Sequence, residues 1–273
     1  MRKPSAPNRP IDLRRTSTWT DRFANYRHTV TDQTVKMWME QFRQNDRDLA
    51  ARILDCIDFI TTDQMAAAFR SILNSLTGWH LDPRKRKGKW VFVSFSGSPG
   101  ESGDNMLYQF RVANKLDHRR YDELFIYTRD LPSAKLTAED TVVFVDDFAG
   151  TGTQACETWE NTLQELLPGE PSTYLILIAA SLSARDKIRA STRLTVLPHI
   201  TITGKSNIFS SECIHFTQED KDKLLGYCGI ADRKYPRGYG DCGFVIVFSH
   251  RCPNNSIPIL HAQNGRWNGL FPR

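Results

Sequence analysis

The spacing of apolar residues separates a helical first part of the chain from a middle part in which strands and helices alternate. Between residues 32 and 78, apolar side chains recur at helical intervals in three stripes, the first of which includes Val35, Met39 and Phe42. Thr62 and Asp63 precede the third stripe, and both are residue types that cap helices. We therefore expect a helical segment over residues 32–78, with its apolar faces in a core.

Residues 1–31 show no such periodicity. They are rich in Pro, Arg, Ser and Thr, and five cations lie among the first fifteen positions: Arg2, Lys3, Arg9, Arg14 and Arg15. A segment of this composition buries too little apolar surface to fold alone, so the pattern predicts a mobile basic tail.

In the middle of the chain, apolar runs typical of strands alternate with helical segments. The predicted strands cover residues 90–96, 123–128, 142–147, 173–180, 193–197 and 199–203, and helices are expected at 105–115, after residue 152 and at 185–189. Several of the strands are continuously apolar, which is typical of a parallel sheet covered by helices on both faces. We predict an α/β core with a parallel, Rossmann-like sheet over residues 79–204.

The C-terminal third departs from this alternation. It contains one expected helix at 218–225, one strong strand at 243–250, and connections rich in Pro and Asn. Residues 205–273 are therefore predicted to be a hood or extension of the core and not an independent domain.

Composition narrows the class of protein. The chain has 273 residues, of which 40% are hydrophobic and 25% charged, as in ordinary globular proteins. The longest apolar stretch, 174–182, is too short to span a membrane, and the polar N-terminus does not resemble a signal peptide. Six scattered cysteines are typical of reduced thiols. We expect a cytoplasmic protein that does not associate with membranes.

The net charge of +5 is unevenly distributed. The tail and the run Arg84-Lys85-Arg86-Lys87, with Lys89, supply much of it. Basic runs attract nucleic acids and other polyanions, although most are solvated loops.

The stretch with the clearest chemistry is 141–158, TVVFVDDFAGTGTQACET. Its apolar strand ends in Asp146 and Asp147, and ligands of open parallel sheets bind beyond the carboxyl ends of the strands. The following loop suits a phosphate, because glycines allow close backbone approach and hydroxyl groups add donors. The residues concerned are Gly150, Thr151, Gly152, Thr153 and Gln154.

The two aspartates would repel that phosphate and suit hydroxyl groups or a divalent metal nearby. Vicinal hydroxyls beside a phosphate describe a ribose 5-phosphate. The alternative interpretation is a Gly-rich turn in which the carboxylates cap local N–H groups. A P-loop is excluded, since the lysine of that motif is missing.

The run 142–153, VVFVDDFAGTGT, resembles the phosphoribosyl-pyrophosphate motif of type I phosphoribosyltransferases, and the likeness extends over residues 91–196. The resemblance implies a phosphoribosyltransferase-like fold, a glycosyltransferase activity, phosphoribosyl pyrophosphate as donor and Mg²⁺ as cofactor. It implies that Asp146 and Asp147 bind the ribose hydroxyls and the metal, and that loop 150–154 binds the 5-phosphate. It also implies that the diphosphate is bound by Ser96, Gly97, Ser98 and Arg129.

The chain departs from that family in ways that leave the acceptor open. It lacks a long Lys-rich loop like that of orotate phosphoribosyltransferase, and no purine-stacking segment follows residue 180. Glu101 also lies within the expected diphosphate loop. The resemblance is therefore specific for the donor sugar only.

Two segments nearer the ends of the chain resemble a narrower group of proteins. The segment WMEQF at 38–42 and the ending GYGDCGFVIVFSHRCPNNSIPILH at 238–261 resemble phosphoribosyltransferase-like proteins of bacterial anti-phage systems, some of which accompany retron reverse transcriptases. This implies an effector that modifies or cleaves a nucleobase or nucleotide, with Asp241 in the hood as general base. A nucleic acid, a retron complex or a second copy of the chain would be its partner. The alternative is a catalytically degenerate nucleotide-binding regulator or a nucleic-acid-associated module.

Overall fold

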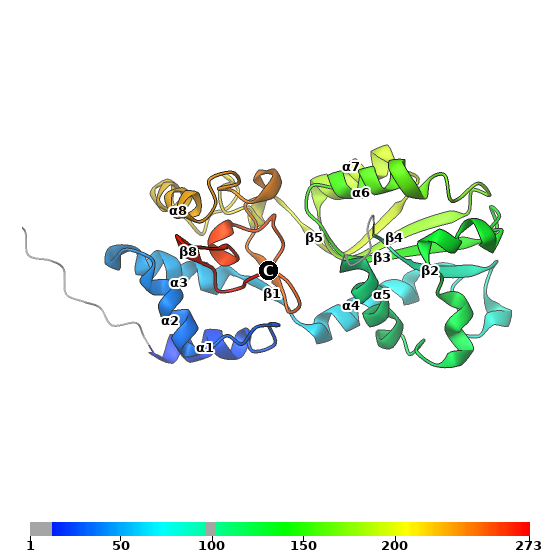
Figure 1. The fold of residues 1–273 in the computed structure, drawn as a ribbon, viewed down its shortest axis with the longest axis horizontal. Coiled ribbons are helices and arrows are strands. Elements are labelled where there is room, and N and C mark those ends of the chain that lie inside the picture. The colour runs from blue at the N-terminus through cyan, green and yellow to red at the C-terminus, as the bar shows by residue number, and fades with distance from the viewer. Residues whose placement is uncertain (1–12, 97–101) are drawn as a thin grey trace, which may run out of the picture. The chain divides into compact units, whose positions relative to one another are not determined.

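A computed structural model of the chain describes residues 13–96 and 102–273, and these residues fall into two units (Figure 1). One unit is residues 63–203. The other combines the N-terminal segment up to Thr62 with residues 204–273, so the N-terminal helices and the C-terminal segment share a unit. We call them the sheet unit and the terminal unit.

The sheet unit is built on four parallel strands. These are β2 (Trp90–Ser94), β3 (Thr141–Ala149), β4 (Ser172–Ser181) and β5 (Thr195–Ile202), in the spatial order β2-β3-β4-β5. Ser94 lies level with Val145, and Asp146 lies level with Leu177. The predicted α/β fold with a parallel sheet is confirmed.

Helices cover both faces of this sheet, as Figure 1 shows. They are α4 (Thr62–Ser75), α5 (Ser102–Ala113), α6 (Thr153–Thr158), which continues as a π-helical turn (Trp159–Leu163), and α7 (Leu182–Ser191). Val91 and Val93 share a core with Trp159 and Ile188 on one face. The ring of Phe92, between those valines, contacts Phe110 of α5 at 5.0 Å on the other. Successive side chains of β2 therefore point to opposite faces of the sheet and contribute to the core on each face.

The strand prediction for residues 123–128 is wrong. A 3₁₀ helix occupies Arg119–Leu124, and only Phe125 forms an isolated parallel bridge, with Phe92. The guanidinium of Arg111 lies over the Phe125 ring at 4.7 Å and pairs with Asp122, so α5 holds this segment in a turn.

The predicted strands 193–197 and 199–203 form a single strand, β5. Pro198, which cannot donate a ladder hydrogen bond, lies in its middle, level with Leu177. β5 is an edge strand, where a proline is tolerated because its nitrogen can face away from the neighbouring strand.

The terminal unit brings together segments from both parts of the sequence. It contains α1 (Leu13–Arg22), α2 (Asp32–Glu40), α3 (Arg47–Cys56), β1 (Asp58–Ile60), α8 (Gln218–Ala231), β6 (Ile246–Phe248), β7 (Gln263–Asn264) and β8 (Trp267–Asn268). β1 pairs in parallel with β6, which is shorter than the predicted strand. The structure thus groups the chain differently from the predicted segments 32–78 and 205–273, because α2 and α3 share a core with residues after 204 while α4 packs in the sheet unit.

The mobile-tail prediction also needs correction for residues 13–31. Residues 13–22 form α1, and four apolar side chains at near-helical spacing are at most 4% exposed: Trp19, Phe23, Tyr26 and Val30. This stripe is sparse and lies among Arg, Ser and Thr, which hid it in the sequence. The rest of the predicted tail lies outside the described residues.

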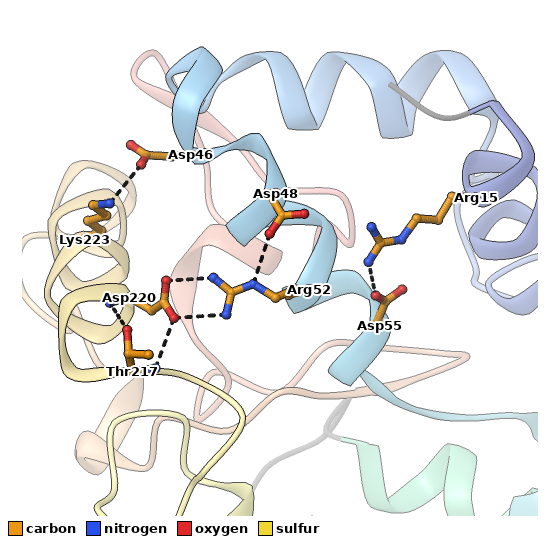
Figure 2. A network of polar contacts seen from close by, with 8 residues as sticks. All are labelled: Arg15, Asp46, Asp48, Arg52, Asp55, Thr217, Asp220 and Lys223. Atoms are coloured by element: carbon orange, nitrogen blue, oxygen red, sulfur yellow. Dashed lines mark hydrogen bonds and ion pairs between the residues drawn. The ribbon is translucent and has the colours of Figure 1, made fainter. Parts of the chain in front are cut away.

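A polar network joins α3 to α8 (Figure 2). Arg52 donates two hydrogen bonds to the Asp220 carboxylate, at 3.0 and 2.7 Å, and forms a 3.4 Å ion pair with exposed Asp48. Asp220 also completes a capping box with Thr217 at the start of α8. The bonds from Arg52 hold the pKa of Asp220 well below its usual range.

The described helices include none with the length and apolar character needed to cross a bilayer.

Candidate functional site

The two aspartates lie near the end of β3, which continues through them to Ala149. Asp147 is 8% exposed and Asp146 is half-buried. The Oδ1 atom of Asp146 accepts the backbone N–H of Asp147 at 2.9 Å, so this carboxylate turns back onto the chain.

The loop that follows is tied to the next strand and helix. The hydroxyl of Ser181, the last residue of β4, donates to the Gly150 carbonyl at 2.6 Å and accepts the Ala184 N–H at the start of α7. Within the loop, the Thr151 hydroxyl accepts the Thr153 N–H at 3.3 Å. The loop therefore has a defined shape at the carboxyl edge of the sheet.

Gly152 is the N-cap of α6, with a φ of 72° in the left-handed region. A Cβ atom at this position would lie 2.8 Å from the Ala184 carbonyl oxygen and 3.1 Å from Ile188 Cγ1, both in α7. The sequence analysis assigns this glycine to close approach of a phosphate. The structure adds that backbone conformation and helix packing require glycine here with or without a ligand.

The side chains of the loop are partly or fully exposed. Thr151 and Thr153 are half-buried and Gln154 is exposed. They follow directly on the acidic pair, so acceptors for sugar hydroxyls and donors for a phosphate come from one continuous segment, 146–154.

The end of β2 approaches the same edge. The Phe95 N–H donates to the Val145 carbonyl at 2.9 Å, which brings Ser96 toward the end of β3. The Ser94 and Ser96 hydroxyls are 3.5 Å apart. A Cβ on Gly103 of α5 would lie 2.5 Å from the Phe95 carbonyl oxygen, so α5 begins directly against this strand end. Gly97 and Ser98, the other predicted diphosphate ligands, lie outside the described residues.

Arg129 does not follow a strand, because residues 123–128 do not form one. It belongs to a 3₁₀ helix (Thr128–Asp130), and its side chain is 79% exposed. The guanidinium lies over the Tyr127 ring at 4.8 Å and 3.9 Å from Asp130. Arg129 therefore does not lie at a strand end as predicted, and its role in binding the diphosphate stays a prediction.

Asp241 belongs to the terminal unit, whereas the acidic pair belongs to the sheet unit. Its φ of 53° is left-handed, and its N–H donates to Gly238 at 3.1 Å in a tight turn. The side chain is exposed. This geometry explains the aspartate after Gly240 as a turn residue, and its function as a base stays a prediction.

Two further residues contact the loop that no sequence pattern predicts, Ser181 and Lys187. The Nζ atom of Lys187 in α7 donates to Thr153 Oγ1 at 2.8 Å. These contacts join residues more than thirty positions apart, and no local motif marks them.

A parallel α/β sheet carrying an acidic pair and a Gly-Thr-Gly-Thr loop at one strand end is the arrangement expected of a phosphoribosyltransferase-like protein. The model of the PRTase-CE family matches residues 35–273, a range that runs through both units. The chain therefore belongs to the PRTase-CE family, which is phosphoribosyltransferase-like. No curated protein matches it.

Proposed function

We propose that the chain is an enzyme that uses phosphoribosyl pyrophosphate and Mg²⁺ to modify or cleave a nucleobase or nucleotide. One observation carries the proposal: in a member of a phosphoribosyltransferase-like family, the acidic pair and the hydroxyl-rich loop occupy one strand-to-helix connection at the carboxyl edge of the sheet.

In this proposal the acidic pair and the loop bind different parts of the donor. The carboxylates of Asp146 and Asp147 accept hydrogen bonds from the two ribose hydroxyls, and loop 150–154 binds the 5-phosphate. The bond between the sugar C1 and the diphosphate oxygen breaks, its electron pair leaves with the diphosphate, and the acceptor bonds to C1 while its proton passes to a base or to solvent. The chain needs no covalent nucleophile, because it contributes positioning and stabilises charge.

The residues present fit Mg²⁺ better than a metal held by protein ligands alone. Within residues 13–96 and 102–273, no three His, Cys, Asp or Glu side chains gather where they could hold a metal ion. Mg²⁺ commonly takes one or two carboxylates and completes its shell with substrate oxygens and water. Asp146 and Asp147 would hold it, and it would offset the negative charge of the departing diphosphate.

The test is the double variant Asp146→Asn, Asp147→Asn. Asparagine keeps the size of each side chain but removes both charges, so we expect affinity for phosphoribosyl pyrophosphate with Mg²⁺ to fall at least tenfold in calorimetric titration. Glu157→Gln, an exposed charge on α6, is the control and should bind normally. Unchanged affinity in a folded double variant would refute the donor site.

The cellular role we propose is that of an anti-phage effector. It is supported by the family match, which covers residues 38–42 and 238–261, the two segments whose sequences resemble such effectors. In cells expressing the chain during phage infection, nucleotide pools should change, and the double variant should leave them unchanged. Identical metabolite profiles for the two proteins would contradict an effector that works through this site.

A further inference from the structure

Helix α7 contacts the loop at three successive points. At its start, Ser181 donates to the Gly150 carbonyl. One turn on, the backbone of Ala184 lies where a side chain on Gly152 would be. In the next turn, Lys187 donates to the Thr153 hydroxyl at 2.8 Å. The start of α7 and its first two turns therefore constrain Gly150, Gly152 and Thr153 of the loop in turn.

The position of Lys187 follows from helix geometry. Ala184, Lys187 and Ile188 are related by three and four positions and share one face of α7. Ala184 and Ile188 are fully buried and face Gly152. The lysine on the same face is therefore directed along the loop toward the start of α6, although its side chain stays exposed.

The charge of Lys187 is not balanced by a neighbouring acid. Asp186, the adjacent carboxylate, pairs with Arg185 at 2.8 Å, and among the ion pairs of the described residues none involves Lys187. An ammonium group has three donors, and the contact with Thr153 uses one. A positive charge with donors to spare therefore lies beside the hydroxyl of the loop.

We propose that Lys187 binds the 5-phosphate of the substrate and selects for 5-phosphorylated ribose ligands. The inference rests on the proposed function, because it places the 5-phosphate in loop 150–154. The Thr153 hydroxyl and the ammonium group, 2.8 Å apart, act on the same phosphoryl oxygens. A phosphate ester is close to a dianion at neutral pH, so a lysine adds more affinity than the neutral hydroxyl groups can.

A purely structural role for Lys187 makes a different prediction. If the lysine only holds the Thr153 hydroxyl in place, Lys187→Gln should have no further effect in a chain that already carries Thr153→Val. If it binds the phosphate, Lys187→Gln should weaken ribose 5-phosphate binding in that background as well. Magnesium pyrophosphate, which does not occupy the loop, reports any general loss of the site.

The experiment titrates both probes into the full chain and its variants. Lys187→Gln should lower affinity for ribose 5-phosphate about tenfold or more, as expected for one charge-assisted hydrogen bond. It should leave magnesium pyrophosphate binding unchanged, and Lys187→Arg should retain ribose 5-phosphate binding within a few-fold. Lys85→Gln, which removes an equal exposed charge from the run 84–89, should bind both probes as the original chain does.

The outcomes separate this inference from the proposed function. If Lys187→Gln binds ribose 5-phosphate normally while Asp146→Asn, Asp147→Asn loses phosphoribosyl pyrophosphate, the lysine assignment is overturned and the donor site stands. Equal weakening by Lys85→Gln and Lys187→Gln would show a general charge effect and would also overturn it. Failure of the unaltered chain to bind either sugar phosphate overturns both proposals together.

Discussion

Both the packing of α7 and the close approach of a phosphate require a glycine at position 152. Its φ of 72° is unfavourable for other residues, and α7 occupies the place of a side chain. Loss of ligand binding on substitution would therefore have two explanations. Stability has to be measured first.

We predict that Gly152→Ala lowers the free energy of unfolding by about 1–3 kcal/mol, because a Cβ would strain the backbone and press on the Ala184 carbonyl. Gly226 in α8 is the control, since a Cβ there meets no atom within 4 Å. Gly226→Ala should raise stability by up to about 1 kcal/mol. Urea unfolding measures both free energies. If the free energy of unfolding of Gly152→Ala equals that of the unaltered chain, α7 can move away from the loop.

At the site, the sequence predicts the residues that are neighbours along the chain. It misses the residue that folding brings to the loop from a distant position. Asp146, Asp147 and the loop form one continuous segment, so pattern and resemblance place them on a strand end. Lys187 reaches Thr153 from a separate helix, 34 positions along the chain. Only the packing of α7 against Gly152 creates that contact, and no spacing in the sequence encodes it.

Among the elements, α3 and α8 are joined by an arginine-carboxylate contact between Arg52 and Asp220 (Figure 2). The side chain of Asp220 is only 15% exposed and accepts both terminal nitrogens of Arg52. A carboxylate with a lowered pKa stabilises the folded state only while it is ionised. Its contribution is complete above the unfolded pKa of about 3.9 and is lost as the pH falls toward the lower folded value.

We therefore predict that Asp220→Asn lowers the free energy of unfolding by about 1–3 kcal/mol at pH 7, and that the difference from the unaltered chain shrinks below about pH 4. Asp48→Asn removes the exposed partner of the same arginine, 78% accessible, and should cost well under 1 kcal/mol. Denaturant unfolding at pH 7 and pH 3 tests this. A difference that is no smaller at pH 3 than at pH 7 would rule out the ion pair as its source.

The elements that the sequence misplaces are those decided by distant contacts. Residues 123–128 have an apolar pattern suited to a strand, but Arg111 of α5 holds the segment through Phe125 and Asp122. Long, continuously apolar strands such as β3 and β4 are predicted well because burial on both faces leaves little choice of structure.

On the scale of the whole molecule, the chain leaves the terminal unit after β1 and returns to it after β5. The parallel pairing of Asp58 with Ile246 and of Ile60 with Phe248 joins the two parts of that unit. The sheet unit, which holds the acidic pair and the loop, has its own buried core. We therefore expect a substitution in the terminal core to affect the two units unequally.

Phe23 tests this organisation, because it lies in the segment whose composition suggests a tail. Its fully buried ring contacts Phe59 at 5.4 Å and Phe271 at 5.0 Å, and so links the N-terminal helices to β1 and to the end of the chain. Phe23→Ala should destabilise the terminal unit by about 3–5 kcal/mol. Met37→Ala, at a side chain 55% exposed on α2, should change stability by under about 1 kcal/mol. Scanning calorimetry should show a lowered transition for Phe23→Ala while a second, that of the sheet unit, remains. Equal stability of the two variants would mean that residues 13–31 are not part of the core, and a uniform shift of all transitions would mean that the two units unfold as one.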